Sequence, residues 1–166
     1  MTHSAPTAQI GQFVVTFQAI EAGLTDLIVL LTGADDEYVH ILISELEYNS
    51  RVRATDVAFS RFVALNAQAD ESAPTEFHKL MSELLKLGER RNAVVHSRYN
   101  ILVLTDGTLG LMRRNAKLRP SKGSREHEEE DLLPESLNDD LRRLEDGLLR
   151  LERFRQKVVE WKSPVT

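Results

Sequence analysis

Apolar residues recur at helical spacing at both ends of the chain. Near the N-terminus they are three or four positions apart, at Ile10, Phe13, Phe17, Ile20, Leu24, Leu27 and Leu31. This spacing predicts a long helix that buries one face and ends at Gly33. Near the C-terminus the same spacing predicts a final helix, with apolar positions at Leu137, Leu141, Leu144, Leu148, Leu151, Phe154, Val158 and Trp161. Ser136 and Asp139 have the character of a capping box at its start.

The middle of the chain predicts three more helices. Residues 37–46 form the first, and the segment after Tyr48 forms a second that reaches Leu65, with a break near Asn49. Residues 66–76 are polar and have the composition of a loop. The next helix is expected to begin near Pro74 or Thr75 and to continue to Tyr99. Its core-facing positions are Phe77, Leu80, Met81, Leu84, Leu85, Val94 and Val95.

Two apolar runs follow this helix and flank Asp106-Gly107, a dipeptide typical of tight hairpin turns in which both residues have positive φ. We therefore expect a small two-stranded hairpin. Residues 114–134 are charged and contain proline, so an exposed loop, partly disordered or acting as a flap, is predicted there. The expected fold is a single all-α domain over residues 1–166, an antiparallel bundle of four to five helices with one hairpin.

Charge and composition limit the classes of function that this chain can have. The net charge is -5, yet the segment from Lys86 to Arg125 has ten basic residues against two acids, a local excess of +8. Such a segment can attract a polyanion to one place, or it can be a solvated charged surface. The chain has no cysteine, which excludes disulfides and thiolate metal sites. The N-terminus lacks a basic signal region and no apolar stretch is long enough to span a membrane, so a cytoplasmic protein is expected.

One segment concentrates polar chemistry on the fourth predicted helix. At about 100° per residue, one helical stripe holds Glu89, Asn92, His96 and Tyr99. Arg91 lies about 140° from His96 on the same helix, so its side chain, or a partner chain, has to reach toward a shared phosphate. His127 lies in an acidic run that lacks the ligand spacing of a metal site, and we expect no metal.

The residues Arg91-Asn92-Ala93-Val94-Val95-His96 resemble the HEPN motif, in which an arginine and a polar residue precede a histidine by a fixed interval. The predicted helical order is similar to that family as well. The resemblance implies a metal-independent endoribonuclease without cofactors, with His96 as general acid or base, Arg91 stabilising the phosphate and Asn92 orienting one of them. A histidine exchanges protons near neutral pH, and a guanidinium matches a pair of phosphoryl oxygens.

Other residues are assigned to supporting roles. Arg90, Arg98 and Tyr99 are candidate RNA contacts, and Glu21 on the first helix is a candidate anchor for an arginine. The resemblance also implies a homodimer in which two motifs face each other, and a regulatory partner such as an antitoxin or a nucleotidyltransferase. Some such family members carry a tyrosine two residues after the histidine, where the partner attaches nucleotide; here that position is Arg98.

Three functions remain open at this point. The first is a HEPN-type endoribonuclease that acts as a toxin or defence effector. The second is a HEPN-like dimer that binds RNA, a nucleotide or a protein without cutting. The third is an interaction protein whose leucine-rich final helix pairs with a larger enzyme, although we favour packing of that helix within its own bundle.

Overall fold

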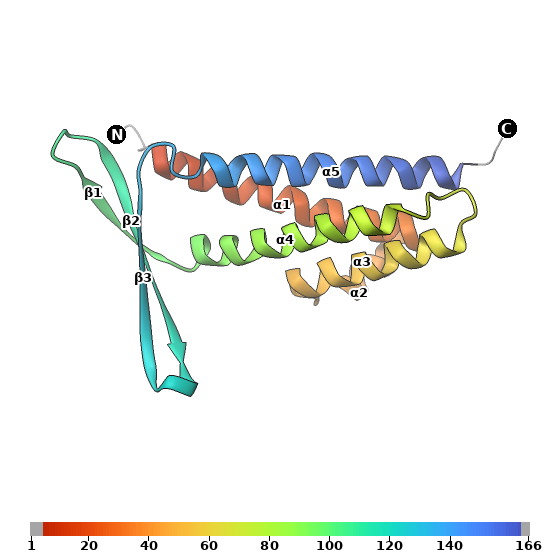
Figure 1. Ribbon diagram of the computed structural model, residues 1–166, viewed down its shortest axis with the longest axis horizontal. Coiled ribbons are helices and arrows are strands. Elements are labelled where there is room, and N and C mark those ends of the chain that lie inside the picture. Colours follow the sequence, from red (N-terminus) through yellow and green to blue (C-terminus); the bar gives the residue numbers. More distant parts are fainter. Residues whose placement is uncertain (1–4, 164–166) are drawn as a thin grey trace.

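The structure is a computed structural model that describes residues 5–163, and it combines a helical bundle with a β-sheet at one end (Figure 1). The elements, in chain order, are α1 (Ala5–Thr32), α2 (Asp36–Ile43), α3 (Tyr48–Leu65), α4 (Ala73–Val95), β1 (Arg98–Val103), β2 (Leu109–Arg119), a 3-10 turn (Pro120–Lys122), β3 (Ser124–Leu132) and α5 (Asn138–Lys162). The five predicted helices are confirmed. The all-α class is wrong, because the three strands form one antiparallel sheet in the order β1-β2-β3.

The core of the bundle is built from the apolar stripes that the sequence predicts. Phe13, Phe17, Ile20, Leu24 and Leu27 of α1 are buried against the buried stripes of α4 and α5. Aromatic rings from three helices meet in the middle of this core: Phe59 stacks on Phe77 with a centroid distance of 4.0 Å, and Phe154 meets both edge-on. The α5 stripe therefore packs within its own bundle, as favoured from the sequence.

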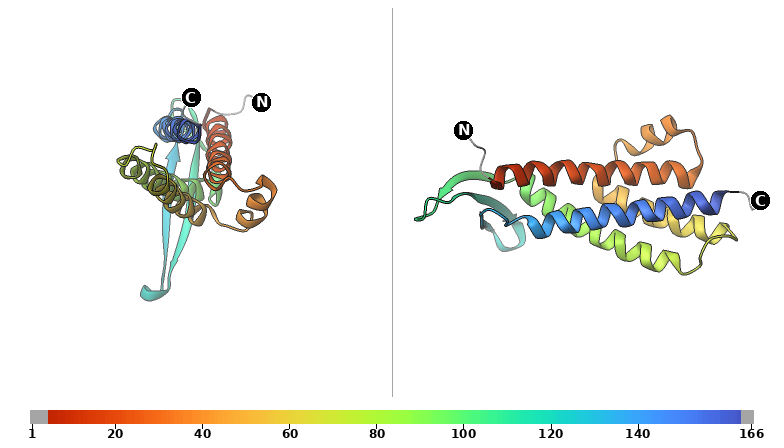
Figure 2. Two further views of the ribbon diagram at one scale, coloured as in Figure 1. Left: turned by 90° about the vertical axis from the view of Figure 1, so that its right-hand side faces the viewer. Right: turned by 90° about the horizontal axis from the view of Figure 1, so that it is seen from above.

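The helix directions differ from a simple antiparallel bundle. Gln9 near the start of α1 donates a hydrogen bond to Asn138 at the start of α5, and Lys162 at the end of α5 donates one to the carbonyl of Leu30. These two helices therefore lie side by side and run in the same direction (Figure 2). The strands carry the chain out and back at one end of the bundle, so α5 runs antiparallel to α4 and parallel to α1.

The helix α1 is also the one described helix that is long and apolar enough, by length and composition, to cross a membrane, from Pro6 to Thr32. Its apolar stripe lies in the core of the bundle. This is the arrangement of a core helix and is compatible with a soluble protein.

The predicted hairpin is present between β1 and β2, but its turn differs in detail. The amide of Gly107 donates to the carbonyl of Leu104, and Gly107 alone in this turn has a positive φ, of 84°. Asp106 instead accepts a hydrogen bond from the amide of Thr108. This is the longer hairpin connection, a turn followed by one left-handed residue, in which only the glycine needs positive φ.

The predicted loop over residues 114–134 is wrong for most of its length. Residues Leu111–Arg119 of β2 pair in register with Ser124–Leu132 of β3. The strand β1 covers β2 only as far as Arg114, so from Asn115 onward β2 and β3 project as a two-stranded arm, called here the ribbon (Figure 1). The capping box is also absent, because Ser136 accepts a hydrogen bond from the amide of Leu133 and no side chain caps α5.

Candidate functional site

The motif segment lies where α4 meets β1. The last turn of α4 is anchored by the buried side chain of Val94, and the helix ends at His96, whose amide donates to the carbonyl of Asn92. The imidazole of His96 is exposed. Two side chains beyond the helix fold back onto its carbonyl groups: Ser97 donates to Ala93, and Tyr99 donates to Val94 over 2.6 Å.

Tyr99 therefore does not share a helical stripe with His96, and the prediction that α4 reaches Tyr99 is wrong. Its ring is half-buried and its hydroxyl closes the end of α4. Burial raises the pKa of this phenol, an effect that the nearby charges of Arg113 and Arg90 oppose. These contacts give Tyr99 a packing role at the junction.

Arg91 and Asn92 lie on the surface of α4, one turn before His96. The guanidinium of Arg91 donates to the side-chain oxygen of Asn92 over 3.1 Å, and it lies over the ring of Phe17 on α1, 5.8 Å from the centroid. Neither contact involves a carboxylate, so the positive charge of Arg91 is available to a ligand. Asn92 orients Arg91 through its side chain and holds His96 only through its backbone carbonyl.

Glu21 has no ion pair with an arginine among residues 5–163. It lines a groove between α1, α2 and α3 together with Thr25, His40 and Arg51. Its charge acts on Tyr48 instead: burial first, and then Glu21, raise the pKa of that hydroxyl far above its usual range. The structure does not bring Glu21 to Arg91.

Arg90 is engaged within the protein. Its guanidinium forms a two-pronged pair with Glu130 of β3, with both distances 2.8 Å, and a further bond of 2.7 Å with Asp140 of α5. Bidentate pairs of this kind are strong and directional. These hydrogen bonds outweigh partial burial and raise the pKa of Arg90 beyond its already high value. These pairs give Arg90 a structural role in place of the RNA contact that the sequence predicts.

Arg113 was not singled out from the sequence, yet it is the largest buried polar side chain, at 1% exposure. It pairs with Glu130 at 2.7 Å and Glu128 at 3.1 Å, and donates to Ala93 and Ser97 at the end of α4. Arg113 and Arg90 thus share Glu130 and fasten the sheet to two helices. Its only signal in the sequence was its place directly after the apolar run Leu109–Met112 of the predicted hairpin.

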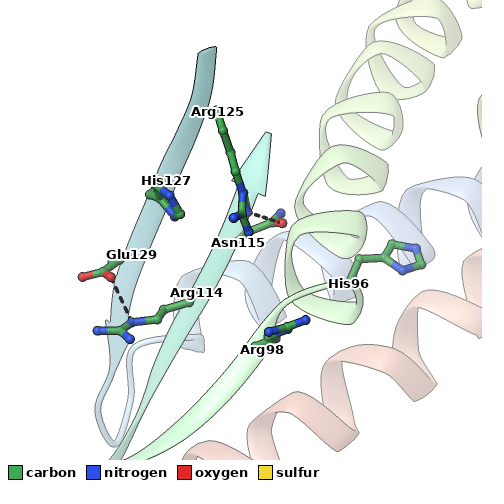
Figure 3. Close-up of a pocket in the computed structure, with 8 residues that line it drawn as sticks. His96, Arg98, Arg114, Asn115, Arg125, His127 and Glu129 are labelled. Atoms are coloured by element: carbon green, nitrogen blue, oxygen red, sulfur yellow. Dashed lines mark hydrogen bonds and ion pairs between the residues drawn. The ribbon is translucent and has the colours of Figure 1, made fainter. Parts of the chain in front are cut away.

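A hollow of about 470 Å³ lies between the end of α4 and the ribbon. Its lining is rich in basic groups and comprises His96, Arg98, Arg114, Asn115, Ala116, Arg125, His127 and Glu129 (Figure 3). In the close-up, the imidazole of His96 points away from the ribbon, while Arg125 extends from β3 toward Asn115 of β2. His96 therefore borders the hollow, and Arg91 does not line it.

The charge in and around the hollow is lower than the sequence count indicates. Five of the ten basic residues between Lys86 and Arg125 are ion-paired, chiefly to the acidic run on β3: Arg90, Arg113, Arg114, Arg119 and Lys122. In the hollow, Arg114 pairs with Glu129 at 2.9 Å. Arg98 and Arg125 have no carboxylate partner in the described part of the chain, so they carry the unbalanced positive charge.

Comparison with known proteins adds no relative: no family model, no curated protein and no solved structure matches this chain. Within residues 5–163, no group of three or more histidine, aspartate or glutamate side chains is arranged to hold a metal ion. The motif segment and the hollow are therefore the features of this chain that bear on function.

Proposed function

We propose that this protein is a metal-independent, cytoplasmic endoribonuclease of HEPN type. The observation that carries the proposal is the position of His96, an exposed imidazole at the end of α4 on the border of a hollow that holds two unpaired arginines, Arg98 and Arg125. Exposed imidazole supplies proton transfer, and arginine without a carboxylate partner supplies phosphate binding.

These groups support a reaction in which a ribose 2′-hydroxyl of the RNA is the nucleophile. His96 takes the proton of a ribose 2′-hydroxyl, whose oxygen attacks the adjacent phosphorus, or it returns a proton to the departing 5′-oxygen. The P–O5′ bond breaks, and the products are a 2′,3′-cyclic phosphate and a 5′-hydroxyl. Arg91 balances the additional negative charge on the phosphoryl oxygens during the attack, a form of electrostatic stabilisation.

The separation of Arg91 from the hollow supports a homodimer. Arg91 lies against Phe17 on the bundle, whereas His96 borders the hollow beside the sheet. In the proposed dimer, Arg91 of one copy and His96 of the other act on one phosphate. As a toxin or defence effector the dimer would be restrained by a partner, an antitoxin or a nucleotidyltransferase.

The decisive experiment incubates purified protein with transfer RNA and total RNA in the presence of a chelator, and detects 2′,3′-cyclic phosphate ends. His96→Ala is expected to lower the cleavage rate by about 10²–10⁴-fold through loss of proton transfer. Arg91→Ala is expected to lower it strongly as well. His78→Ala is the matched control, because His78 is an exposed histidine on the same helix that pairs with Asp56 outside the hollow.

A second function, RNA binding without cleavage, is favoured by Arg98 and Arg125, which supply phosphate contacts whether or not His96 acts as a catalyst. Absence of cyclic phosphate ends with wild-type protein that still binds RNA would support it. Equal cleavage by the wild-type, Arg91→Ala and His96→Ala proteins would reject the assigned site.

A further inference from the structure

The two faces of the ribbon differ in how their charges are balanced. Strand pairing places Arg114 opposite Glu129, Ala116 opposite His127, and Leu118 opposite Arg125. Residues directly opposite each other share a face of a sheet, and alternate residues along a strand share it too. These six residues therefore form one face, called here the hollow face, because five of them line the hollow.

On the opposite face of the ribbon the arginines are ion-paired, and only Lys117, opposite Glu126, has no ion pair within residues 5–163. Arg119 pairs with Glu126 at 2.8 Å, and Lys122 in the turn pairs with the same carboxylate at 3.5 Å. Hydrogen bonding from Arg119 is the main reason that the pKa of Glu126 lies below its usual range. Nearer the base of the ribbon, Arg113 is paired on this side with Glu128 and Glu130.

On the hollow face, positively charged and apolar side chains remain exposed. Arg125 and His127 are exposed and lack a carboxylate partner within residues 5–163, and Leu118 is 75% exposed. Arg98, at the start of β1, faces the same hollow. A row of arginine, histidine and an exposed apolar side chain matches single-stranded RNA, in which phosphates alternate with unstacked bases.

We propose that Arg125 and His127 of the hollow face, together with Arg98 of β1, bind single-stranded RNA next to the phosphate that is cut at His96. Arg98 and Arg125 contact phosphates, and His127 and Leu118 contact unpaired bases. The inference rests on the proposed function for its substrate, and it adds a binding track outside the motif. The projecting length of β2 and β3 contributes little to the core of the bundle, and RNA binding would explain why this length is present.

The test measures binding separately from cleavage, by fluorescence anisotropy of a labelled single-stranded RNA over a series of salt concentrations. All variants are made in the His96→Ala background, so that the RNA stays intact. Arg98→Ala and Arg125→Ala are each expected to weaken binding and to reduce the slope of log K against log salt by about 0.7, the value for one lost phosphate contact. His127→Ala is expected to weaken binding roughly five-fold or more, as for loss of a base contact.

Arg119→Ala is the matched control, because it removes the same charge from the opposite face of the same ribbon, where Arg119 is paired with Glu126. Equal effects of Arg119→Ala and Arg125→Ala on affinity and salt slope would overturn the proposal. So would a His96→Ala protein that binds no RNA, or a polyglutamate peptide that competes as well as unlabelled RNA.

The two proposals fail in distinguishable ways. RNA binding that depends on Arg98 and Arg125, together with wild-type protein that does not cut, would leave the hollow face established and the ribonuclease rejected. Cleavage that depends on His96, together with binding that is indifferent to Arg98 and Arg125, would leave the ribonuclease and reject the hollow face.

Discussion

Arg113 shows how a single buried charge connects the sheet to the bundle. Its side chain is 1% exposed and has two carboxylate partners, Glu128 and Glu130, in addition to a carbonyl at the end of α4. A buried charge is tolerated only when it is paired and hydrogen-bonded. Glu130 also holds Arg90, so one carboxylate supports two arginines.

Glu130→Gln is expected to destabilise the protein by about 2 kcal/mol, below the range for a fully buried pair because Glu130 is partly exposed. Removing its charge leaves Arg113 with only one carboxylate. The measurement is the free energy of unfolding in urea at neutral pH. Glu129→Gln is the matched control, because Glu129 pairs with the exposed Arg114 and is expected to change stability by less than about 0.5 kcal/mol.

The same residue predicts a pH dependence. Hydrogen bonding from Arg90, and less strongly from Arg113, lowers the pKa of Glu130 against the opposing effect of burial. A lowered pKa in the folded state contributes stability that is fully present above the unfolded pKa of about 4.3 and is lost as the pH falls through the folded value. The thermal midpoint of wild-type protein should therefore fall more steeply below about pH 4 than that of Glu130→Gln. Parallel curves would contradict this.

These residue contacts were out of reach of sequence reasoning. The sequence predicts Arg90 as an RNA contact, but its carboxylate partners Glu130 and Asp140 lie 40 and 50 positions along the chain. The acidic run of β3 and the basic run of β2 looked like separate segments, and only strand pairing shows that they neutralise each other. By contrast, the motif spacing singles out His96 as the catalytic candidate, and the structure leaves its side chain exposed beside a basic hollow. Its catalytic role stays a prediction.

At the scale of elements, the close packing of α3 against α4 depends on Gly88, which has no side chain. A Cβ at Gly88 would lie 2.5 Å from the ring of Tyr48. This ring is tilted against Phe17 with a centroid distance of 4.7 Å, and its hydroxyl donates a hydrogen bond to the carbonyl of Leu84. Two contacts, one to Phe17 and one to Leu84, therefore hold the ring in place. The glycine is therefore required by close approach of the two helices.

Gly88→Ala is expected to destabilise the protein by about 1–3 kcal/mol through overpacking, although alanine favours helix by about 1 kcal/mol. Gly11→Ala is the control in α1, because no atom lies within 4 Å of the added Cβ, and it should be neutral or stabilising by up to about 1 kcal/mol. Chemical denaturation of both variants checks the difference. A Gly88→Ala protein as stable as Gly11→Ala would mean that Tyr48 moves aside.

The helices could be predicted because their apolar stripes are long and regular, whereas the ribbon could not. Strands are recognised by alternation of apolar and polar residues, and both faces of the ribbon are exposed and charged. The segment SREHEEED therefore has the composition of a loop, although every residue in it pairs with β2. The end of α4 was misjudged for a related reason, since the polar motif continues without a break into β1.

At the scale of the whole molecule, the two motif residues face different parts of the fold. Arg91 lies against Phe17 on the bundle, whereas His96 borders the hollow. If two copies share each active site, mixing inactive Arg91→Ala and inactive His96→Ala proteins creates mixed dimers with one intact site. Random exchange is then expected to restore about a quarter of wild-type cleavage. Each variant alone, refolded in the same way, is the control, and no restoration would place both residues of a site in one chain.

The parallel course of α1 and α5 has a practical consequence for anyone handling this protein. Because both helices run away from the sheet, the start of α1 lies at the sheet end of the bundle and the end of α5 lies at the far end (Figure 1). An affinity tag, a fluorophore or a surface linker attached after α5 therefore leaves the hollow and ribbon accessible to long RNA. The same attachment before α1 sits beside them and would compete for that space.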